Sequence, residues 1–172
     1  MDWARDLPGW PHAQASRRID HPPHRWHVQE MGQGETLLLI HGAGASTHSW
    51  RGLMPLLAER WHVVALDLPG QGFTQAGTRS RSSLPLMSDD IAALTEAQGW
   101  RPEAVIGHSA GGAIALELAR RLRPRPKVVG INAALGNFEG VAGWLFPMLA
   151  KFLALNPFTA GLFTLGGASP AR

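Results

Sequence analysis

A serine between glycines is the side chain of this sequence best placed for nucleophilic chemistry. It is Ser109, the centre of a G-H-S-A-G pentapeptide at residues 107–111. The apolar run at 104–106 and the helical pattern after the pentapeptide predict a strand, a sharp turn and a helix, the setting of a nucleophile elbow. Gly107 and Gly111 suit so tight a turn because glycine has no Cβ to collide with neighbouring backbone. The sequence therefore predicts that Ser109 is a nucleophile at the carboxyl end of a sheet.

A second loop is expected to lie beside this serine. Residues 36–40 form an apolar run, as expected of a parallel strand covered on both faces, and they lead directly into an H-G-A-G sequence. The backbone N–H groups of Ala43 and Ala110 are expected to form an oxyanion hole that stabilises the negative charge developing when Ser109 attacks its substrate. The residues expected to support the two loops are His41, Gly42, Gly44, Gly107 and Gly111.

The sequence contains no evident base for this serine. A serine hydroxyl is a weak nucleophile until a neighbouring base accepts its proton, and in elbow-type enzymes the acid and the histidine follow the serine. No histidine follows Ser109, and the only later acidic residues are Glu117 and Glu139. The earlier histidines of the two loops, His41, His48 and His108, are not expected to substitute. Little triad-dependent turnover is predicted for this chain.

Three other histidines have a spacing that suggests a metal or tetrapyrrole site. They are His21, His24 and His27, in an H-x-x-H-x-x-H pattern. Pro22 and Pro23 exclude a regular helix there, and no nearby carboxylate cluster completes a site. We interpret these histidines as structural and expect neither a metal nor a cofactor.

Composition narrows the class of protein. The 172 residues suggest one domain, and 16 basic against 13 acidic residues give a net charge of +3. Arginines gather at an expected helix C-terminus, where cations complement the helix dipole, so no nucleic-acid partner is expected; they are Arg120, Arg121, Arg123 and Arg125. The absence of cysteine excludes disulfides and thiol catalysis. No secretory signal is visible at the N-terminus, which favours a cytoplasmic protein.

Strands alternate with helices along the chain. After an irregular lead-in over 1–24, we expect strands at 25–30, 36–40, 62–66, 104–106 and 127–131, and helices at 49–60, 88–98 and 113–122, with Ser49 as a cap. This alternation predicts an α/β fold whose sheet is mostly parallel, with helices on both faces. The loop at 67–72 and the polar connection at 74–83 interrupt the regular elements.

The last thirty residues differ from the rest. Residues 141–171 carry a single charge, Lys151. A membrane span is disfavoured by the interrupting prolines and glycines, and a core helix would contain fewer of them. An apolar lid over a hydrophobic substrate fits best, with membrane-surface contact as an additional interpretation. We therefore divide the chain into part of a core at 1–137 and the start of a lid at 138–172, which is incomplete.

Several motifs together resemble the α/β-hydrolase superfamily. They are H-G-A-G-A-S-T-H-S-W (41–50), D-L-P-G-Q-G-F-T (67–74) and G-H-S-A-G-G (107–112). Gln71 departs from the histidine that is common in the second motif. Within the superfamily, a group resembled closely is the magnesium chelatase accessory proteins of bacteriochlorophyll biosynthesis, through D-W (2–3), W-P (10–11), A-S-R (15–17), R-W-H-V-Q (25–29) and L-A-L-N-P (153–157).

This resemblance implies a cytoplasmic or membrane-peripheral protein that assists magnesium insertion into protoporphyrin. Two functions remain open. In the first, Ser109 hydrolyses an apolar ester, thioester or carbon–carbon substrate, and the acid and histidine are missing from this C-terminally incomplete chain. In the second, the protein is a non-catalytic accessory whose apolar lid binds a porphyrin or contacts the chelatase.

Overall fold

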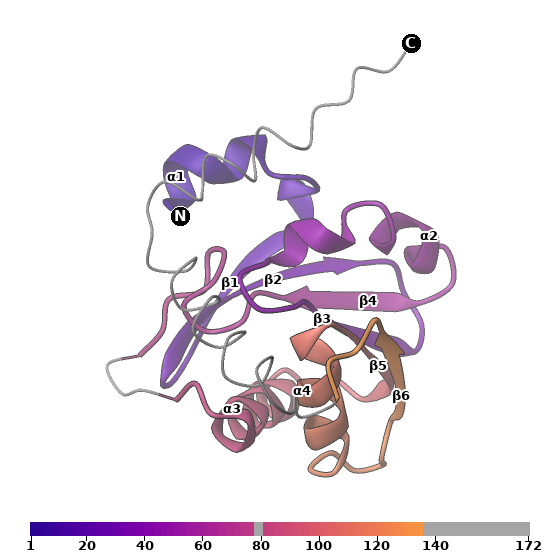
Figure 1. Ribbon diagram of the computed structural model, residues 1–172. Coiled ribbons are helices and arrows are strands. Elements are labelled where there is room, and N and C mark those ends of the chain that lie inside the picture. The colour runs from indigo at the N-terminus through magenta and orange to yellow at the C-terminus, as the bar shows by residue number, and fades with distance from the viewer. Residues whose placement is uncertain (78–80, 136–172) are drawn as a thin grey trace. The chain divides into compact units, whose positions relative to one another are not determined.

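A single sheet forms the centre of the computed structural model, which describes residues 1–77 and 81–135. The strands of that part are β1 (Ser16–His21), β2 (His24–Met31), β3 (Thr36–Ile40), β4 (His62–Leu66), β5 (Pro102–His108) and β6 (Lys127–Ile131). They lie in the order β1-β2-β4-β3-β5-β6 (Figure 1). The pairs β3–β4, β3–β5 and β5–β6 are parallel, whereas β2 is antiparallel to β1 and β4. The expected mostly parallel sheet is confirmed.

Helices cover both faces of this sheet (Figure 1). The α-helices are α1 (Trp3–Asp6), α2 (Met54–Ala58), α3 (Leu84–Ala97) and α4 (Ala110–Ala119), and 3₁₀ helices span Leu7–Gly9, Ala13–Ala15 and Thr47–Trp50. Alternate residues of β3 point to opposite faces. Leu38 and Ile40 pack in one cluster with side chains of α3 and α4. Leu39 packs in the other, with Trp50 and Met54.

The N-terminal region is more regular than predicted. The irregular lead-in expected over 1–24 is wrong, because it contains α1 and β1. β1 escaped prediction because only Ile19 of its six residues is buried, so no apolar alternation marks it. Its register with β2 pairs His21 with His24, which leaves Pro22 and Pro23 as the turn between the two strands.

Helix boundaries also differ from those expected. The helix predicted over 49–60 is a 3₁₀ helix at Thr47–Trp50 followed by the short α2, and Ser49 caps neither. The helix predicted over 88–98 begins four residues earlier, at Leu84, because Pro85 is tolerated in a first turn. The helix predicted over 113–122 begins at Ala110, directly after Ser109.

Two further predictions concern the lid and a membrane span. The lid predicted for 138–172, with Glu139, lies outside the described residues. Among the described helices, none has both the length and the apolar composition needed to cross a bilayer.

Candidate functional site

Ser109 occupies the turn between β5 and α4 with an uncommon backbone conformation. Its φ of 52° and ψ of −120° are rare for a residue with a side chain, and such conformations cost about 1–3 kcal/mol unless their surroundings hold them. Three backbone hydrogen bonds of 3.0 Å hold it here. Its N–H donates to the carbonyl of Ile131, and its carbonyl accepts from the N–H groups of Gly112 and Ala134. The turn is therefore fixed by β6, by α4 and by the segment after β6.

The glycines around this serine allow backbone segments to approach closely. A Cβ on Gly107 would lie 2.2 Å from the carbonyl oxygen of Gly111. A Cβ on Gly111 would lie 2.3 Å from the carbonyl oxygen of Ile40, at the end of β3. Both distances are far inside van der Waals contact with backbone atoms that cannot move aside, so glycine is required at each position.

The H-G-A-G loop (residues 41–44) lies against the serine. A Cβ on Gly42 would be 3.1 Å from the Cβ of Ser109 and 3.4 Å from Nδ1 of His108. Within the loop, the N–H of Ala45 donates to the carbonyl of Gly42 at 3.2 Å and closes a tight turn. The sequence elements predicted to meet at the carboxyl ends of β3 and β5 are therefore adjacent.

His41 is fully buried and holds this loop through both ring nitrogens. Its Nε2 accepts a hydrogen bond from the N–H of Leu68 at 3.0 Å, so Nδ1 carries the proton and donates to the carbonyl of Gly42 at 2.7 Å. Burial lowers the pKa of His41, which keeps the ring neutral. With both nitrogens engaged, His41 supports the loop and is not available to accept a proton from Ser109.

A buried carboxylate joins the segment that follows the H-G-A-G loop to the loop after β4. Oδ1 of Asp67 accepts from the N–H of Thr47 at 2.6 Å, and Oδ2 accepts from the N–H of Phe73 at 2.8 Å. Nδ1 of His27, on β2, lies 2.6 Å from the same Oδ2. Close by, Oε1 of Gln71 accepts from the N–H of Gly44 at 2.7 Å. The loop after β4 therefore holds the H-G-A-G loop and the segment after it in place through hydrogen bonds.

The N-terminal segment adds contacts that the sequence analysis missed. The indole N–H of Trp10 donates to Oγ1 of Thr47 at 3.2 Å. Trp3 packs edge-on against His27 and Phe73, with ring centroids 5.5 and 5.7 Å apart. Trp3, Trp10 and His27 belong to the D-W, W-P and R-W-H-V-Q motifs that mark the resemblance. These motifs were the signal in the sequence that pointed to this region. Their contacts tie the chain's first residues to the loops around the site.

Two backbone amides near Ser109 have no acceptor within residues 1–77 and 81–135. They are the N–H groups of Ala43 and of Ala110, the first residue of α4. The first N–H groups of a helix have no intrahelical acceptor, so that of Ala110 is free to bind another group. Both amides are those that the sequence predicted as oxyanion donors.

A proton acceptor for the serine hydroxyl is missing from the described residues. None of their histidines is hydrogen-bonded to Oγ of Ser109. His48 packs against Trp10, and burial lowers its pKa. His108 faces Trp50, with ring centroids 6.5 Å apart, and its buried Nδ1 has no partner there. Glu117 lies on α4, where a hydrogen bond from Arg121 lowers the pKa of its carboxyl group.

The H-x-x-H-x-x-H histidines do not converge on one point. Nε2 of His24 donates to Asp90 at 3.1 Å, while its Nδ1 accepts from the N–H of Gly77. His27 binds Asp67 instead, as described above. Residues three apart in a strand face opposite ways, so both histidines serve structural contacts. Among the described residues, no group of three or more potential ligands is arranged to hold a metal ion.

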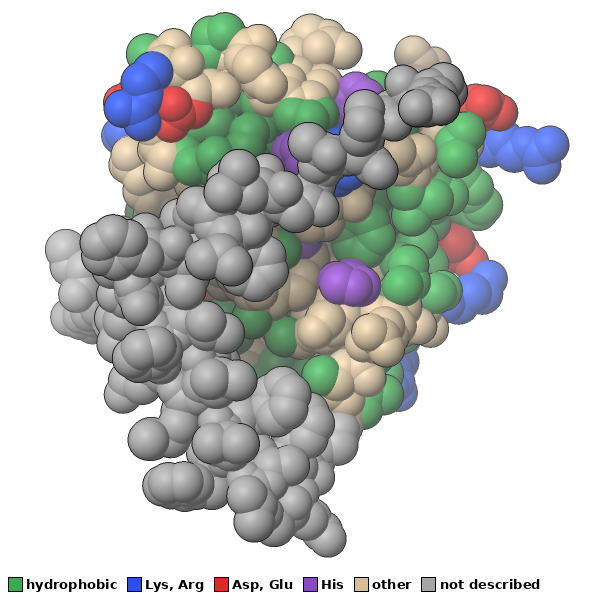
Figure 2. Space-filling model, turned by 45° about the horizontal axis from the view of Figure 1, so that its top comes forward, with side chains coloured by type: hydrophobic (Ala, Val, Ile, Leu, Met, Phe, Trp, Pro, Cys, Tyr) green, Lys and Arg blue, Asp and Glu red, His purple; other side chains and the backbone are tan. Residues whose placement is uncertain are grey.

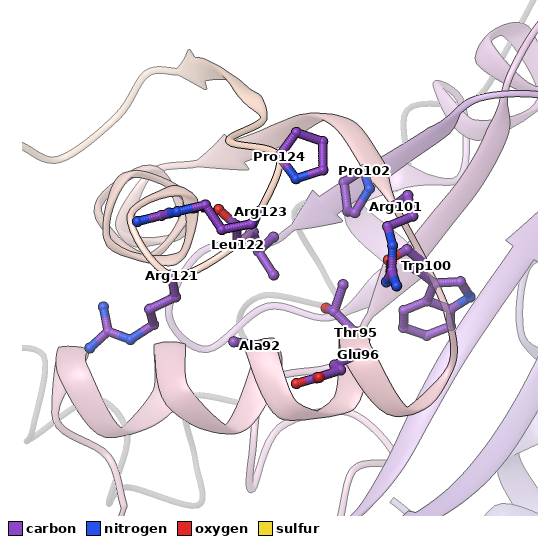
Figure 3. Close-up of a pocket in the computed structure, with 10 residues that line it drawn as sticks. All are labelled: Ala92, Thr95, Glu96, Trp100, Arg101, Pro102, Arg121, Leu122, Arg123 and Pro124. Atoms are coloured by element: carbon purple, nitrogen blue, oxygen red, sulfur yellow. Dashed lines mark hydrogen bonds between the residues drawn. The ribbon is translucent and has the colours of Figure 1, made fainter.

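A cavity of about 230 Å³ lies at the amino end of β5, between α3 and the end of α4 (Figure 3). The guanidinium group of Arg121 points away from it and binds Asp89 and Glu117. Arg123 donates to the carbonyls of Arg120 and Leu122, just past the end of α4. Arg121 and Arg123 thus donate to backbone carbonyls at and just past the end of α4, in keeping with the expected position of the cluster at a helix C-terminus.

Charged and uncharged side chains of the described residues lie in different parts of one face of the molecule. On the face drawn in Figure 2, the charged side chains of the described residues lie mostly at the rim, with hydrophobic and uncharged groups between them. β6 also exposes apolar side chains, since Val129 is 47% and Ile131 39% exposed.

Known proteins are similar to this chain in sequence and in fold. The alpha/beta hydrolase fold family matches residues 35–171. The chain is 50% identical over 171 residues to the magnesium-chelatase 30 kDa subunit of Rhodobacter capsulatus, covering 98% of this chain and 60% of that protein. It is 37% identical over 92 residues to a pimeloyl-[acyl-carrier protein] methyl ester esterase of Aeromonas hydrophila, covering 54% of this chain and 35% of that protein.

A solved structure agrees. An alpha/beta hydrolase fold protein from Burkholderia ambifaria superposes with a TM-score of 0.68 at 25% identity, over 87% of this chain and 56% of that one. The chain therefore spans about a third to three fifths of the length of these relatives. With a family match over most of its length and the sheet described above, this chain belongs to the α/β-hydrolase fold family.

Proposed function

We propose that this chain serves magnesium chelation in bacteriochlorophyll biosynthesis as an α/β-hydrolase-type accessory protein in which Ser109 is a nucleophile. The pathway is supported by the 50% identity to the magnesium-chelatase 30 kDa subunit across nearly the whole chain. The nucleophile is supported by one observation above all, the positive φ of Ser109 between β5 and α4. That strained conformation is the one in which an elbow serine exposes its hydroxyl.

In the proposed reaction Oγ of Ser109 attacks an electrophilic carbon of an apolar substrate. The N–H groups of Ala43 and Ala110, which have no acceptor in the described part of the chain, donate to the oxygen that becomes negative. The neutral His41 keeps the first of these amides in place through Gly42. The attack needs a base that accepts the Oγ proton and returns it to the leaving group, and no histidine after Ser109 in these 172 residues can play that part.

The proposed substrate class rests on the composition of the tail. The tail over 141–171 has one charge, which suits an apolar molecule, and a tetrapyrrole is the candidate that the pathway suggests. We also propose contact with the chelatase complex and a location in the cytoplasm or at the membrane surface.

The missing histidine favours a second candidate function. A serine with oxyanion donors and no base retains only weak catalysis, so the fold could serve as a non-catalytic porphyrin- or chelatase-binding module. In that case Ser109 is a structural residue of the turn.

A serine-directed probe and a genetic replacement separate the two candidates. In the purified chain, a fluorophosphonate is expected to form a slow adduct on the peptide containing Ser109, detected by mass spectrometry. The adduct should disappear in Ser109→Ala and persist in Ser49→Ala, an exposed serine near the same loop.

In cells carrying Ser109→Ala, formation of magnesium protoporphyrin should fall at least tenfold. Unchanged formation, with the protein present at its normal level, would contradict the nucleophile and leave the binding module. An adduct on other serines but not on Ser109 would contradict it as well.

A further inference from the structure

We propose that Gln71 is a positioning residue that fixes one peptide unit of the H-G-A-G loop. The proposal rests on the proposed function, because the loop matters chemically only if Ala43 donates to an oxyanion. Gln71 stands where a histidine is common in the resembled motif, and its side chain makes a hydrogen bond that no feature of the sequence foretold.

The loop contains a turn that can take two forms. The N–H of Ala45 donates to the carbonyl of Gly42, so Ala43 and Gly44 are the central residues of a four-residue turn. Gly44 has a φ of +72°, whereas Ala43 is not among the residues with positive φ. This combination is a type II turn. The type I form differs by a rotation of the central peptide, Ala43–Gly44, through roughly half a turn, and glycine tolerates both forms.

Gln71 selects between these forms. Its Oε1 accepts the N–H of the central peptide at 2.7 Å, which is the donor that the rotation would turn away. In the rotated form the carbonyl oxygen of Ala43 would face Oε1 instead, and two acceptors repel each other. Ala43 and Gly44 are both exposed, so no packed side chain around them selects the form. The hydrogen bond to Gln71 does.

Gln71 is itself held on the loop after β4. Its N–H donates to the carbonyl of Leu68 at 2.9 Å, and its carbonyl accepts from the N–H of Thr74 at 3.1 Å. The N–H of Leu68 in turn binds His41, at the start of the H-G-A-G loop. The acceptor on Gln71 is therefore anchored to the same framework as the loop that it fixes.

The consequence concerns the oxyanion donor. The Gly42–Ala43 peptide carries the N–H of Ala43, and the Ala43–Gly44 peptide is the one that Gln71 holds. Fixing the second peptide fixes ψ of Ala43 and occupies the N–H of Gly44. The N–H of Ala43 then remains the amide of this loop that can face the reacting oxygen, with the loop prevented from rotating during the reaction.

Hydrogen exchange tests the tether directly. In Gln71→Ala, exchange of the Gly44 amide should accelerate roughly two- to tenfold, the loss expected for one hydrogen bond. The amides of Thr47 and Leu68, which bind Asp67 and His41, should be unchanged. Gln71→Glu keeps an acceptor of the same length and should restore the slow exchange of Gly44, and Gln14→Ala, an exposed glutamine of the N-terminal segment, is the matched control.

The chemical readout is the rate of fluorophosphonate labelling at Ser109, which should fall several-fold in Gln71→Ala at an unchanged midpoint of unfolding. Unchanged Gly44 exchange, or a joint acceleration at Gly44, Thr47 and Leu68, would overturn the proposal, as would an unchanged labelling rate. If the unaltered protein is not labelled at Ser109, the proposed function fails by itself, and the exchange of Gly44 still decides whether Gln71 fixes the turn.

Discussion

The two ends of β5 differ sharply in how tightly their surroundings constrain them. At the carboxyl end, Gly107 leaves no room for a Cβ, and Ser109 is held at positive φ by three backbone hydrogen bonds. At the amino end, about 20 Å away for a seven-residue strand, Pro102 lines an open cavity and Glu103 binds Lys127 at the surface. In open α/β sheets, loops meet beyond the carboxyl ends of the strands, which is where such constraint has a chemical use.

The largest expected effect is at the carboxyl end. Gly107→Ala places a methyl group 2.2 Å from the carbonyl oxygen of Gly111, and this overlap with backbone should lower the free energy of unfolding by more than about 3 kcal/mol. Urea unfolding followed by tryptophan fluorescence measures it. The control is Gly52→Ala, where a Cβ meets nothing within 4 Å and a change below about 0.5 kcal/mol is expected. Equal midpoints for the two variants would contradict the tight constraint at the carboxyl end of β5.

A smaller effect should appear with pH. The folded pKa of His41 lies below its ordinary value of 6.5 because the ring is buried. As the pH falls below 6.5, His41 therefore binds a proton in the unfolded chain before it does so in the folded protein. The contribution of His41 to stability is complete above pH 6.5 and is lost as the pH falls through the folded pKa, with a slope of at most about 1.4 kcal/mol per pH unit.

Paired variants isolate this contribution. The free energy of unfolding of His41→Gln should depend less steeply on pH between 6.5 and 5 than that of the unaltered protein. His48→Gln should change the slope less, because His48 is only partly buried and solvent screens its charge. A slope in His41→Gln equal to that of the unaltered protein would show that the buried loop histidine is not the group that titrates.

The smallest effect is expected at the amino end. Nζ of Lys127 lies 2.6 Å from Oε1 of Glu103, but these side chains are 78% and 42% exposed. Such surface pairs contribute little, so Lys127→Ala should leave the midpoint of urea unfolding unchanged. Glu103→Gln is the matched removal of the partner's charge. A fall of the urea midpoint comparable to that of Gly107→Ala would mean that this end of β5 is as constrained as the other.

Prediction from the sequence succeeded where the signal was local and apolar. The strands expected at 36–40 and 62–66 have the bounds of β3 and β4, because buried strands read as short apolar runs. The run at 127–131 has the bounds of β6, although β6 is largely exposed in the described residues. Prediction failed for β1, in which only Ile19 is buried, and for the helix expected over 49–60, which proved to be a 3₁₀ helix and a short α2. In these segments local pattern was weak and tertiary contacts decided the backbone.

By itself the sequence determined the turn at Ser109 and the glycines around it, because the strand, the turn and the helix are consecutive and their requirements are local. It also determined that no histidine follows this serine. Only the tertiary structure brought Asp67 to His27, 40 residues away, and Gln71 to Gly44, 27 residues away. These contacts depend on the strand order β2-β4-β3-β5, which sets the ends of distant segments side by side. No pattern within any one segment encodes that order, since it results from how all the strands pack together.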